Sequence, residues 1–410
     1  MSFLGLIAAL LAVPATSDGL EPEVMEVHGL TQKDSAPDSA SNIYLDQYSF
    51  ESADLGELLA RQHGVIVQRT GGLGSAARIS LNGLSGEQIR YFVDGVPLEL
   101  AGFQNGIQNL PVDLFNEVRI YRGVVPSRLG ADALGGAIEL KTDSDLSGTR
   151  AQAAYLLGSF GTHRVSASGS HAFGRSGFVR SFAFFDRTNN RFEIEAPVVN
   201  ELGQVRTETV ERFNDGYDAS GASAEFGLSD DPTFGTLALR AFFSSTQKEI
   251  QNDPFGLRTF GEANRSSEVA GAIGRFDSQF GDRVRVFGSF GSTRTIARFS
   301  DQADCVYSWL GECVGPRAQP GELNDDANDS RQRTRAYFLR STLELELSDA
   351  QLLRFSFAPT QSTLNGSEAI ERPGDVLDPV EAERRLLSAV AGVEHQARLF
   401  DERLVTLTFG

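Results

Sequence analysis

The feature that most constrains this chain is a series of alternating strands, from about residue 149 onward, whose connections are sorted by length. In the clearest strand, Ala336 to Leu347, apolar residues occupy one parity and polar or charged residues the other. Short connections such as 174–177 alternate in order with longer polar ones such as 188–218. In an up-and-down sheet, alternate connections lie at the same end, so the tight turns are expected at one rim and the long loops at the other. Transmembrane β-barrels show this asymmetry, whereas a soluble sandwich has no reason to sort its loops in this way.

Eleven strands are expected in this region. They are placed near 149–158, 163–173, 178–187, 219–228, 236–246, 267–276, 283–298, 333–347, 352–362, 385–399 and 403–409. An odd count is atypical of a bacterial barrel, and so few strands do not enclose a separate domain. The fold class predicted is therefore an all-β transmembrane barrel of which residues 146–410 supply the N-terminal portion, in a chain that is a truncated piece of a longer protein.

Composition excludes two classes of protein. The chain has 410 residues with 37 basic and 55 acidic side chains, which gives a formal net charge of −18. Because nucleic-acid binding draws its affinity from clustered Lys and Arg, no nucleic acid is expected as a partner. After residue 20, no apolar run reaches the roughly 20 residues that a spanning helix needs, so a helical membrane protein is excluded.

The N-terminus and the cysteines both indicate export. Phe3 to Val13 is a short apolar stretch ahead of small residues, so residues 1–15 are expected to be a signal peptide, although no basic residue precedes the stretch; a buried helix is the alternative. Cys305 and Cys313 enclose seven residues of a polar segment. A disulfide between them fits a location outside the cytoplasm, and two free thiols are the alternative.

Residues 16–44 are polar and acidic, and they predict a flexible segment. One hexamer inside it alternates as an extended strand does: Glu23, Val24, Met25, Glu26, Val27 and His28. A strand without a sheet of its own is a candidate for pairing with the sheet edge of another protein. The alternative is an accidental hexamer in a linker.

Residues 45–145 predict a small α+β domain with several glycine-dependent turns. A short helix is expected from Ala53 to Gln62, with Ser52 able to cap it. A helical turn is expected between Pro111 and Asn116. Strands are expected at 65–67, 79–83, 89–93, 118–121 and 137–141.

Three segments of this domain carry a recognisable pattern: Leu58 to Gly83, with its glycine-rich turn; Tyr91 to Leu98; and Val118 to Thr142. Together they resemble the plug domain of TonB-dependent outer-membrane receptors. The positions that match the plug motifs are Asn82, Gly83, Asp94, Gly95, Arg122, Gly123, Gly130, Gly135 and Gly136. The resemblance implies a plug inside a barrel of about 22 strands, whose lumen is too wide for its own side chains to fill.

The resemblance also implies partners and a location. Residues 23–28 are similar to the family's Ton box, which pairs with TonB, the protein that ExbB and ExbD help to energise. The implied location is the outer membrane of a Gram-negative bacterium, in contact with its lipid. The implied function is energy-coupled uptake of a small-molecule or metal-chelate ligand, a ferric siderophore first and haem, cobalamin or a glycan as alternatives. From another class, a soluble or surface β-rich binding protein remains the alternative.

Two departures from the family bear on how the plug is held. The family usually has arginine where Asn82 stands and often an acidic residue where Arg119 stands, whereas Arg122 keeps the second arginine position. Because plug arginines pair with barrel glutamates in the family, the two departures put about half of that lock in question. The order of loops in the family suggests three ligand contacts at the external mouth: Phe103, Gln104 and Asn105.

An enzyme hypothesis has little support in the sequence. Gly72 to Ala77 follows a strand and is similar to a dinucleotide fingerprint, but the alternating Arg78 to Leu81 follows it instead of a helix. No nucleophile-elbow or phosphate-loop pattern occurs. The five histidines lack metal-ligand spacing: His28, His63, His163, His171 and His395. No catalytic residue, cofactor or metal site is therefore expected.

Overall fold

The computed structural model describes residues 40–45, 54–104, 106–130, 135–142, 146, 148–199, 202–253, 256–323, 326–370, 380–399 and 403–409. The expected signal peptide and the hexamer at 23–28 lie outside these residues. Within the described part of the chain, no helix combines the length and the apolar character needed to cross a membrane.

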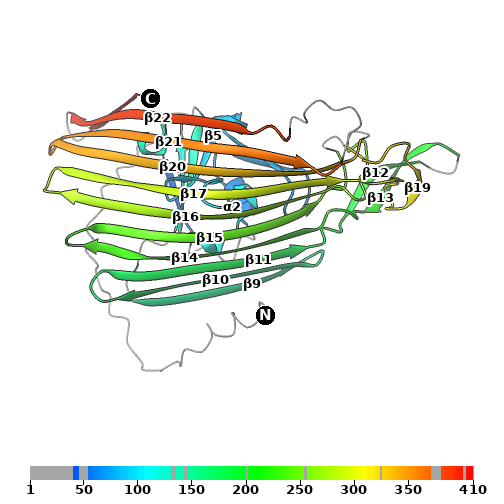
Figure 1. Cartoon of the computed structure of the whole chain (residues 1–410), viewed down its shortest axis with the longest axis horizontal. Helices are drawn as coiled ribbons and strands as arrows, with labels where there is room; N and C mark the ends of the chain where they lie inside the picture. Colours follow the sequence, from blue (N-terminus) through cyan, green and yellow to red (C-terminus); the bar gives the residue numbers. More distant parts are fainter. Residues whose placement is uncertain are drawn as a thin grey trace, which may run out of the picture. The chain divides into compact units, whose positions relative to one another are not determined.

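The largest element is an antiparallel sheet, the large sheet, whose described strands follow in chain order from one edge to the other (Figure 1). Its strands are β9 (Thr149–Gly158), β10 (Thr162–Phe173), β11 (Gly177–Thr188), β14 (Tyr217–Asp231), β15 (Gly235–Glu249), β16 (Asn264–Phe280), β17 (Val284–Asp301), β20 (Asn328–Ser348), β21 (Gln351–Glu368), β22 (Arg384–Leu399) and β23 (Arg403–Phe409). Each of them overlaps one of the eleven strands expected from the alternation, so that prediction is confirmed.

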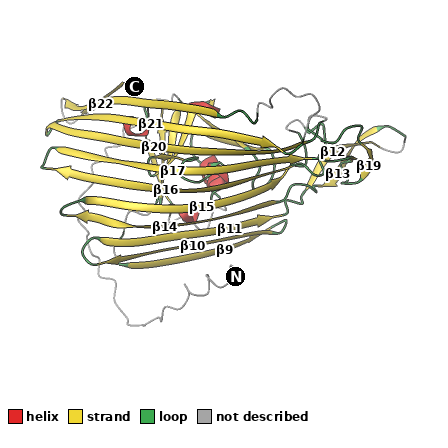
Figure 2. Ribbon diagram, in the orientation of Figure 1, coloured by secondary structure: helices red, strands yellow, loops and turns green. Residues whose placement is uncertain are grey.

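Two of the long connections contain hairpins of their own. The connection from β11 to β14 includes β12 (Glu193–Val199) paired with β13 (Val205–Glu211), and the connection from β17 to β20 includes β18 (Cys305–Tyr307) paired with β19 (Cys313–Pro316). Figure 2 shows these hairpins beyond the same end of the large sheet. The sequence predicted the long connections at this end but not that they fold as strands.

The large sheet buries a partly polar face and exposes an apolar one, which is the reverse of a water-soluble sheet. On β20, Phe338 and Thr342 are buried, whereas Tyr337 and Leu339 are 56% and 38% exposed. Apolar surface left in water costs about 25 cal/mol per Å². Lipid-facing strands of membrane barrels place apolar residues at alternate positions, so the exposed face suits lipid.

The described residues between 40 and 142 form the small domain. One sheet has the order β1 (Ala40–Tyr44), β7 (Glu117–Arg122), β8 (Gly136–Lys141), β5 (Ile89–Val93) and β6 (Val96–Pro97). A second contains β2 (Val65–Arg69), β3 (Ala77–Leu81) and β4 (Leu84–Ser85). The helical elements are α2 (Leu55–Ala60) and the 3-10 turns η1 (Gly86–Gln88), η2 (Ile107–Asn109), η3 (Val112–Leu114) and η4 (Ser127–Leu129).

Two details of this domain correct the sequence predictions. The helix is shorter than 53–62, and Asp54, not Ser52, caps it by accepting a hydrogen bond of 2.9 Å from Glu57 N. An aspartate at this position satisfies one of the free N–H groups of the first turn. The domain also begins before residue 45, because Ala40–Tyr44 pairs along β7 and buries Ile43. This short strand is stabilised by a distant partner and lacks a local signal.

The small domain packs against the buried face of the large sheet. Leu58, Ile138 and Leu140 belong to the same apolar cluster as Phe242 of β15 and Phe338 of β20. Side chains from both parts therefore share one core, and Figure 1 shows the small domain against the strands of the large sheet.

Candidate functional site

A charged contact between the small domain and the large sheet forms at Asp94. This residue and Gly95 make the turn from β5 to β6, with φ of 49° and 79°, a conformation that an Asp-Gly pair adopts readily. The Asp94 carboxylate lies 4.0 Å from Arg180 Nη2 and 3.8 Å from Arg275 Nη1. It also accepts hydrogen bonds from the backbone N and the hydroxyl of Thr142, at 3.1 and 2.7 Å.

Electrostatics at this contact favour the ionised carboxylate. Burial by itself would raise the pKa of Asp94, but the nearby cations outweigh it and lower the pKa to about 2; they are Arg275, Arg180, Lys141 and Arg240. Glu225 of β14 pairs with Arg180 at 2.9 Å and also with Arg275. Two carboxylates from different parts of the molecule thus share two arginines, which joins the small domain to the inner face of the large sheet.

A second contact runs along η4. Ser127 N donates to Glu394 Oε2 at 3.0 Å, and Ser127 Oγ lies 3.2 Å from Ser356 Oγ. Arg340 Nη2 donates to the carbonyl of Leu129 at 2.7 Å. These bonds connect three neighbouring strands of the large sheet to one short segment of the small domain.

The lock implied by the family resemblance is not seen at the predicted positions. Asn82 lies exposed in the turn between β3 and β4, with φ of 50°. Arg122 stays within the small domain, where it donates to the hydroxyl of Ser41 and to the carbonyl of His63. In the described part of the chain, neither side chain reaches a carboxylate of the large sheet.

The cation that pairs with Glu344 and Glu394 of the large sheet also comes from the large sheet. Arg354 pairs with Glu344 at 2.6 Å and with Glu394 at 2.7 Å. A buried carboxylate needs a cation or hydrogen-bond donors to remain charged. Arg354 supplies the charge here, and the backbone N–H of Ser127 supplies one of the donors.

The glycine-rich turn of the small domain lies at the long-loop end of the large sheet. Asn190 Nδ2 donates to the carbonyl of Leu73 at 2.8 Å, and Gly74 N donates to Asn109 Oδ1 at 3.1 Å. Gly74 has φ of 82°, and a Cβ there would clash with the ring of Tyr217. Glycine is therefore required here because the turn closely approaches the large sheet, which we also call the wall. This requirement does not involve phosphate binding.

A buried charged cluster lies beside the same turn. Lys248 Nζ donates to Asp215 Oδ1 at 2.5 Å, and Arg212 Nε lies 3.0 Å from Asp215 Oδ2. Arg212 is also placed over the ring of Phe192, 5.2 Å from its centroid. With two cations for one carboxylate, the cluster gives the wall a positive charge near the tip of the small domain. The sequence reasoning did not identify it, because its members come from separate strands and loops.

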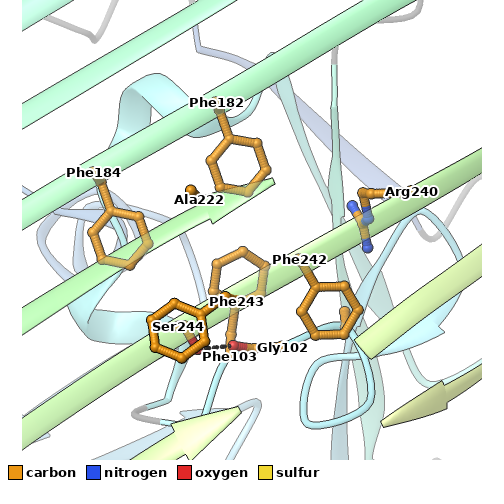
Figure 3. A pocket seen from close by; sticks show the side chains of 10 residues that line it. Gly102, Phe103, Phe182, Phe184, Ala222, Arg240, Phe242, Phe243 and Ser244 are labelled. Atoms are coloured by element: carbon orange, nitrogen blue, oxygen red, sulfur yellow. Dashed lines mark hydrogen bonds between the residues drawn. The ribbon is translucent and has the colours of Figure 1, made fainter. Parts of the chain in front are cut away.

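Two of the three expected ligand contacts are described, and they differ in exposure. Phe103 is only 7% exposed and stacks on Phe182 of β11, with ring centroids 6.4 Å apart (Figure 3). Ser244 Oγ donates to the neighbouring Gly102 carbonyl at 2.6 Å, which anchors this loop to β15. Phe103 therefore belongs to the packing contact with the wall, which corrects its expected position at an open mouth. Gln104 is exposed and donates to the carbonyl of Glu99; Asn105 lies outside the described residues.

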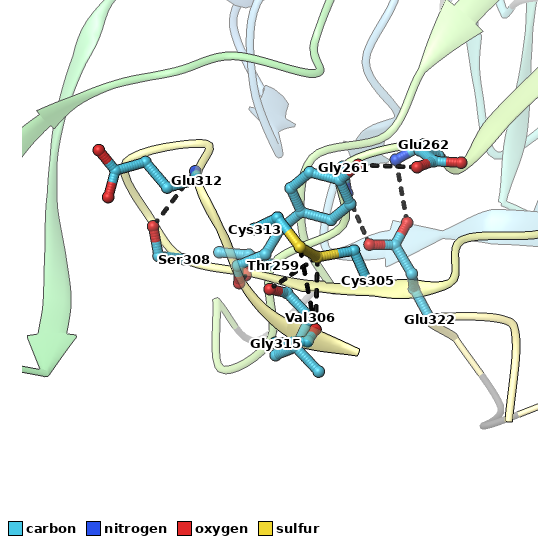
Figure 4. Close-up of a disulfide and its surroundings, with 11 residues drawn as sticks. Thr259, Gly261, Glu262, Cys305, Val306, Ser308, Glu312, Cys313, Gly315 and Glu322 are labelled. Carbon is cyan, nitrogen blue, oxygen red and sulfur yellow. Dashed lines mark hydrogen bonds between the residues drawn. A yellow bond between two sulfur atoms is a disulfide. The ribbon is translucent and has the colours of Figure 1, made fainter. Parts of the chain in front are cut away.

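The two hairpins of the long loops form a small core of their own. A disulfide joins Cys305 to Cys313, as Figure 4 shows, and the loop between them carries Trp309. Trp309 is 8% exposed and clusters with three residues of the β12–β13 hairpin: Ala196, Val198 and Val210. The disulfide loop is thus packed against the neighbouring hairpin.

Glu322, in the connection between β19 and β20, joins that connection to the one between β15 and β16. Its carboxylate accepts hydrogen bonds from Gly261 N at 2.7 Å, Glu262 N at 3.0 Å and Ala263 N at 3.2 Å. Burial and the nearby Asp301 raise the pKa of Glu322 above its ordinary value although these bonds act in the opposite direction. The Glu322 carboxylate thus holds three consecutive backbone N–H groups in place.

Most of the glycines in the predicted plug motifs occupy left-handed backbone positions. Their φ angles are positive at Gly83, Gly95, Gly123, Gly130 and Gly136. At Gly136 a Cβ would clash with the carbonyl oxygen of Tyr121 in the adjacent strand. Gly135 instead donates its N–H to the Gln88 carbonyl at 2.8 Å. In the described part of the chain, no three His, Cys, Asp or Glu side chains are arranged to hold a metal ion.

A small domain attached to the inner face of an up-and-down antiparallel sheet, with long loops at one rim, defines the architecture of a plugged receptor barrel. Residues 32–137 match the family model of the TonB-dependent Receptor Plug Domain. The chain thus contains a match to this plug domain, as its motifs predicted, next to a sheet whose fold resembles the barrels of TonB-dependent receptors.

Known proteins of this type resemble the chain at low identity. The vitamin B12 transporter BtuB of Vibrio vulnificus (strain CMCP6) is 25% identical over 207 residues, which cover 50% of this chain and 32% of that protein. A point mutant of the ferric enterobactin receptor PfeA of Pseudomonas aeruginosa has a TM-score of 0.65 at 16% identity, over 90% of this chain and 56% of PfeA. The siderophore receptor PirA of Acinetobacter baumannii has a TM-score of 0.59 at 15% identity, over 90% of this chain and 56% of PirA. The chain therefore spans less than two thirds of these relatives.

Proposed function

We propose that the full-length protein is an outer-membrane transporter of a Gram-negative bacterium that uses TonB to import a scarce bulky nutrient, with a ferric siderophore as the leading cargo. The observation that carries the proposal is the attachment of the plug to the wall at Asp94, at η4 and at Gly102. A ligand at the long-loop end meets a packed, hydrogen-bonded domain. Its passage requires these contacts to be rearranged, and that rearrangement requires an energy source.

The proposed route for that energy is the hexamer at 23–28, as a strand added to the edge of a TonB sheet. Such pairing depends on backbone hydrogen bonds, which proline cannot donate. Val24→Pro is expected to abolish binding to a purified TonB C-terminal domain and to abolish uptake, while the protein still reaches the membrane. Leu30→Pro, the same change outside the hexamer, is the matched control. If V24P and L30P bind TonB as well as the unchanged protein, the assignment of the hexamer is wrong.

The cargo proposal rests on the siderophore receptors among the solved structures and on the positive charge of the large sheet and its loops beside the tip of the plug. Arg212 and Lys248 surround one carboxylate there, which suits an anionic chelate. A receptor-deletion strain supplied with the full-length gene is expected to regain growth on ferric siderophores under iron limitation. Restored growth on cobalamin alone favours the second candidate, which the similarity to BtuB supports.

The membrane assignment has a separate test. The full-length protein is expected in the outer-membrane fraction and to require detergent for extraction, because the exposed face of its sheet is apolar. A freely soluble monomer contradicts the proposal and favours a β-rich binding protein.

A further inference from the structure

Five arginines lie together on the outward side of β17 and β20, away from the plug. They are Arg294 and Arg298 on β17, and Arg331, Arg333 and Arg335 on β20. The inward side is defined by residues of the opposite parity, such as the buried Thr293 and Ala336. We call these five residues the arginine patch.

The strand register sets like charges directly against each other in this patch. Arg294 is paired with Arg335, Arg298 is paired with Arg331, and Arg333 is opposite Ile296. Like charges directly opposite on neighbouring strands destabilise a sheet. Two such pairs, one after the other on the same face, are thus unfavourable unless an anion lies between them.

The protein itself supplies little negative charge at this place. Among the described residues, none of the five arginines forms an ion pair, and all except the half-buried Arg331 are exposed. On the next strand, the outward residues opposite β20 are neutral: Gln361, Thr363, Asn365 and Ser367. On the other side, β16 contributes a single carboxylate, Glu268, opposite Ile296. Five guanidinium groups therefore face two carboxylates, Glu268 and the Asp329 carboxylate on the same side of β20 as Arg331, in a chain whose net charge is −18.

The patch begins where the apolar band of the outward face ends. Tyr337 is paired with Ser292 and is 56% exposed, and it is followed toward the short turns by Leu339, Leu343, Leu345 and Leu347. Arg335 is two residues from Tyr337 in the opposite direction, about 7 Å along the strand. Aromatic residues flank the apolar band of membrane barrels. The arginines thus lie on the long-loop side of that boundary, at the level of lipid headgroups.

We propose that the arginine patch binds the phosphate groups of an outer-leaflet glycolipid whose acyl chains lie along the apolar band below it. The orientation of the lipid rests on the proposed membrane location. Guanidinium groups donate two parallel hydrogen bonds to a phosphate, and arginines on adjacent strands are close enough to share one anion. The neutral side chains of Thr363 and Asn365 add hydrogen-bonding groups at the edge of the patch.

The test measures lipid bound to the full-length protein in detergent by native mass spectrometry, with diphosphorylated lipid A as the probe. Arg294→Gln with Arg335→Gln is expected to weaken binding roughly 25-fold, at about 5-fold for each arginine near an anionic headgroup. Arg175→Gln removes one exposed arginine in the turn between β10 and β11, outside the patch; it is the control for loss of a surface arginine and is expected to have no effect. The variant with Arg294→Lys and Arg335→Lys keeps the charge. Its lipid affinity is expected to lie between those of the unchanged protein and the double Gln variant.

Three results overturn the proposal. They are equal lipid binding by the double Gln variant, equal binding of dephosphorylated lipid A, and full displacement of the lipid by inorganic phosphate, which would indicate an ion site only. Heat-dependent gel mobility checks that each variant retains its folded barrel. The readout needs neither TonB nor cargo, so a failed uptake assay with intact lipid binding contradicts the proposed function and leaves this inference standing.

Discussion

Replacing the Asp94 carboxylate by an amide tests how the plug is held to the wall. Asp94→Asn keeps the size of the side chain and an acceptor for Thr142, but removes the charge between Arg180 and Arg275. The pKa of Asp94 is lowered from an ordinary value of 3.8 to about 2. Because each tenfold change in proton affinity corresponds to about 1.4 kcal/mol, this depression stabilises the folded plug by roughly 2 kcal/mol.

The sign of the pH dependence follows from the direction of that shift. A carboxylate whose pKa is lowered on folding stabilises the fold fully above its unfolded pKa, near 4, and loses this effect as the pH falls to about 2. The unchanged protein is therefore expected to lose this stabilisation between pH 4 and pH 2. Asp94→Asn is expected to lack that component and to be less stable at neutral pH.

Amide hydrogen exchange of the full-length protein at pH 7 measures the difference. Peptides covering residues 89–98 and 136–142 are expected to exchange about 30-fold faster in D94N, which corresponds to about 2 kcal/mol. Asp282→Asn, which changes an exposed carboxylate in the turn between β16 and β17, is the matched control. Unchanged exchange in D94N would show that Glu225 alone neutralises the two arginines, and it would refute this account of the contact.

Three further substitutions test other contacts. Gly136→Ala places a Cβ against the Tyr121 carbonyl at positive φ, and is expected to destabilise the plug by about 2 kcal/mol, measured by protease resistance. Phe103→Ala removes a buried ring and is expected to cost about 3 kcal/mol in the same assay; full resistance in either variant contradicts the packing described. Cys305→Ser is expected to loosen the outer hairpin by about 2 kcal/mol and to shift the emission of Trp309 to longer wavelength, whereas unchanged emission would show that packing alone holds it.

The large sheet could be predicted from the sequence because its signals are local and repeated. The alternation along 336–347 indicates which side chains face the plug and which face outward. The lengths of the connections indicate at which rim of the sheet each turn lies. The short strand at 40–44 could not be predicted in the same way. Its stability comes from pairing with 117–121, which lies more than seventy residues away.

The attachment of the plug was only partly visible in the sequence. Asp94 was identified as part of a turn motif, but its partners Arg180 and Arg275 lie on strands that the sequence alone does not align with it. Their parity does place them on the inward face, alongside the buried Phe184 and Ile273. Arginines on the inward face of such a sheet can therefore be predicted from the sequence to contact the enclosed domain. Which plug residue each arginine pairs with can be identified only from the three-dimensional structure.

The absence of arginine at position 82 and the arginines around Asp94 have a common explanation in charge balance. A plug without that arginine leaves the wall glutamates without a plug cation, and a buried carboxylate without a partner is costly. In this chain Arg354 satisfies Glu344 and Glu394 from within the wall. The plug then contributes a carboxylate, and the wall contributes the arginines that bind it. The interface is still held by opposite charges, so a charge at one plug position is best interpreted together with the wall strands that face it.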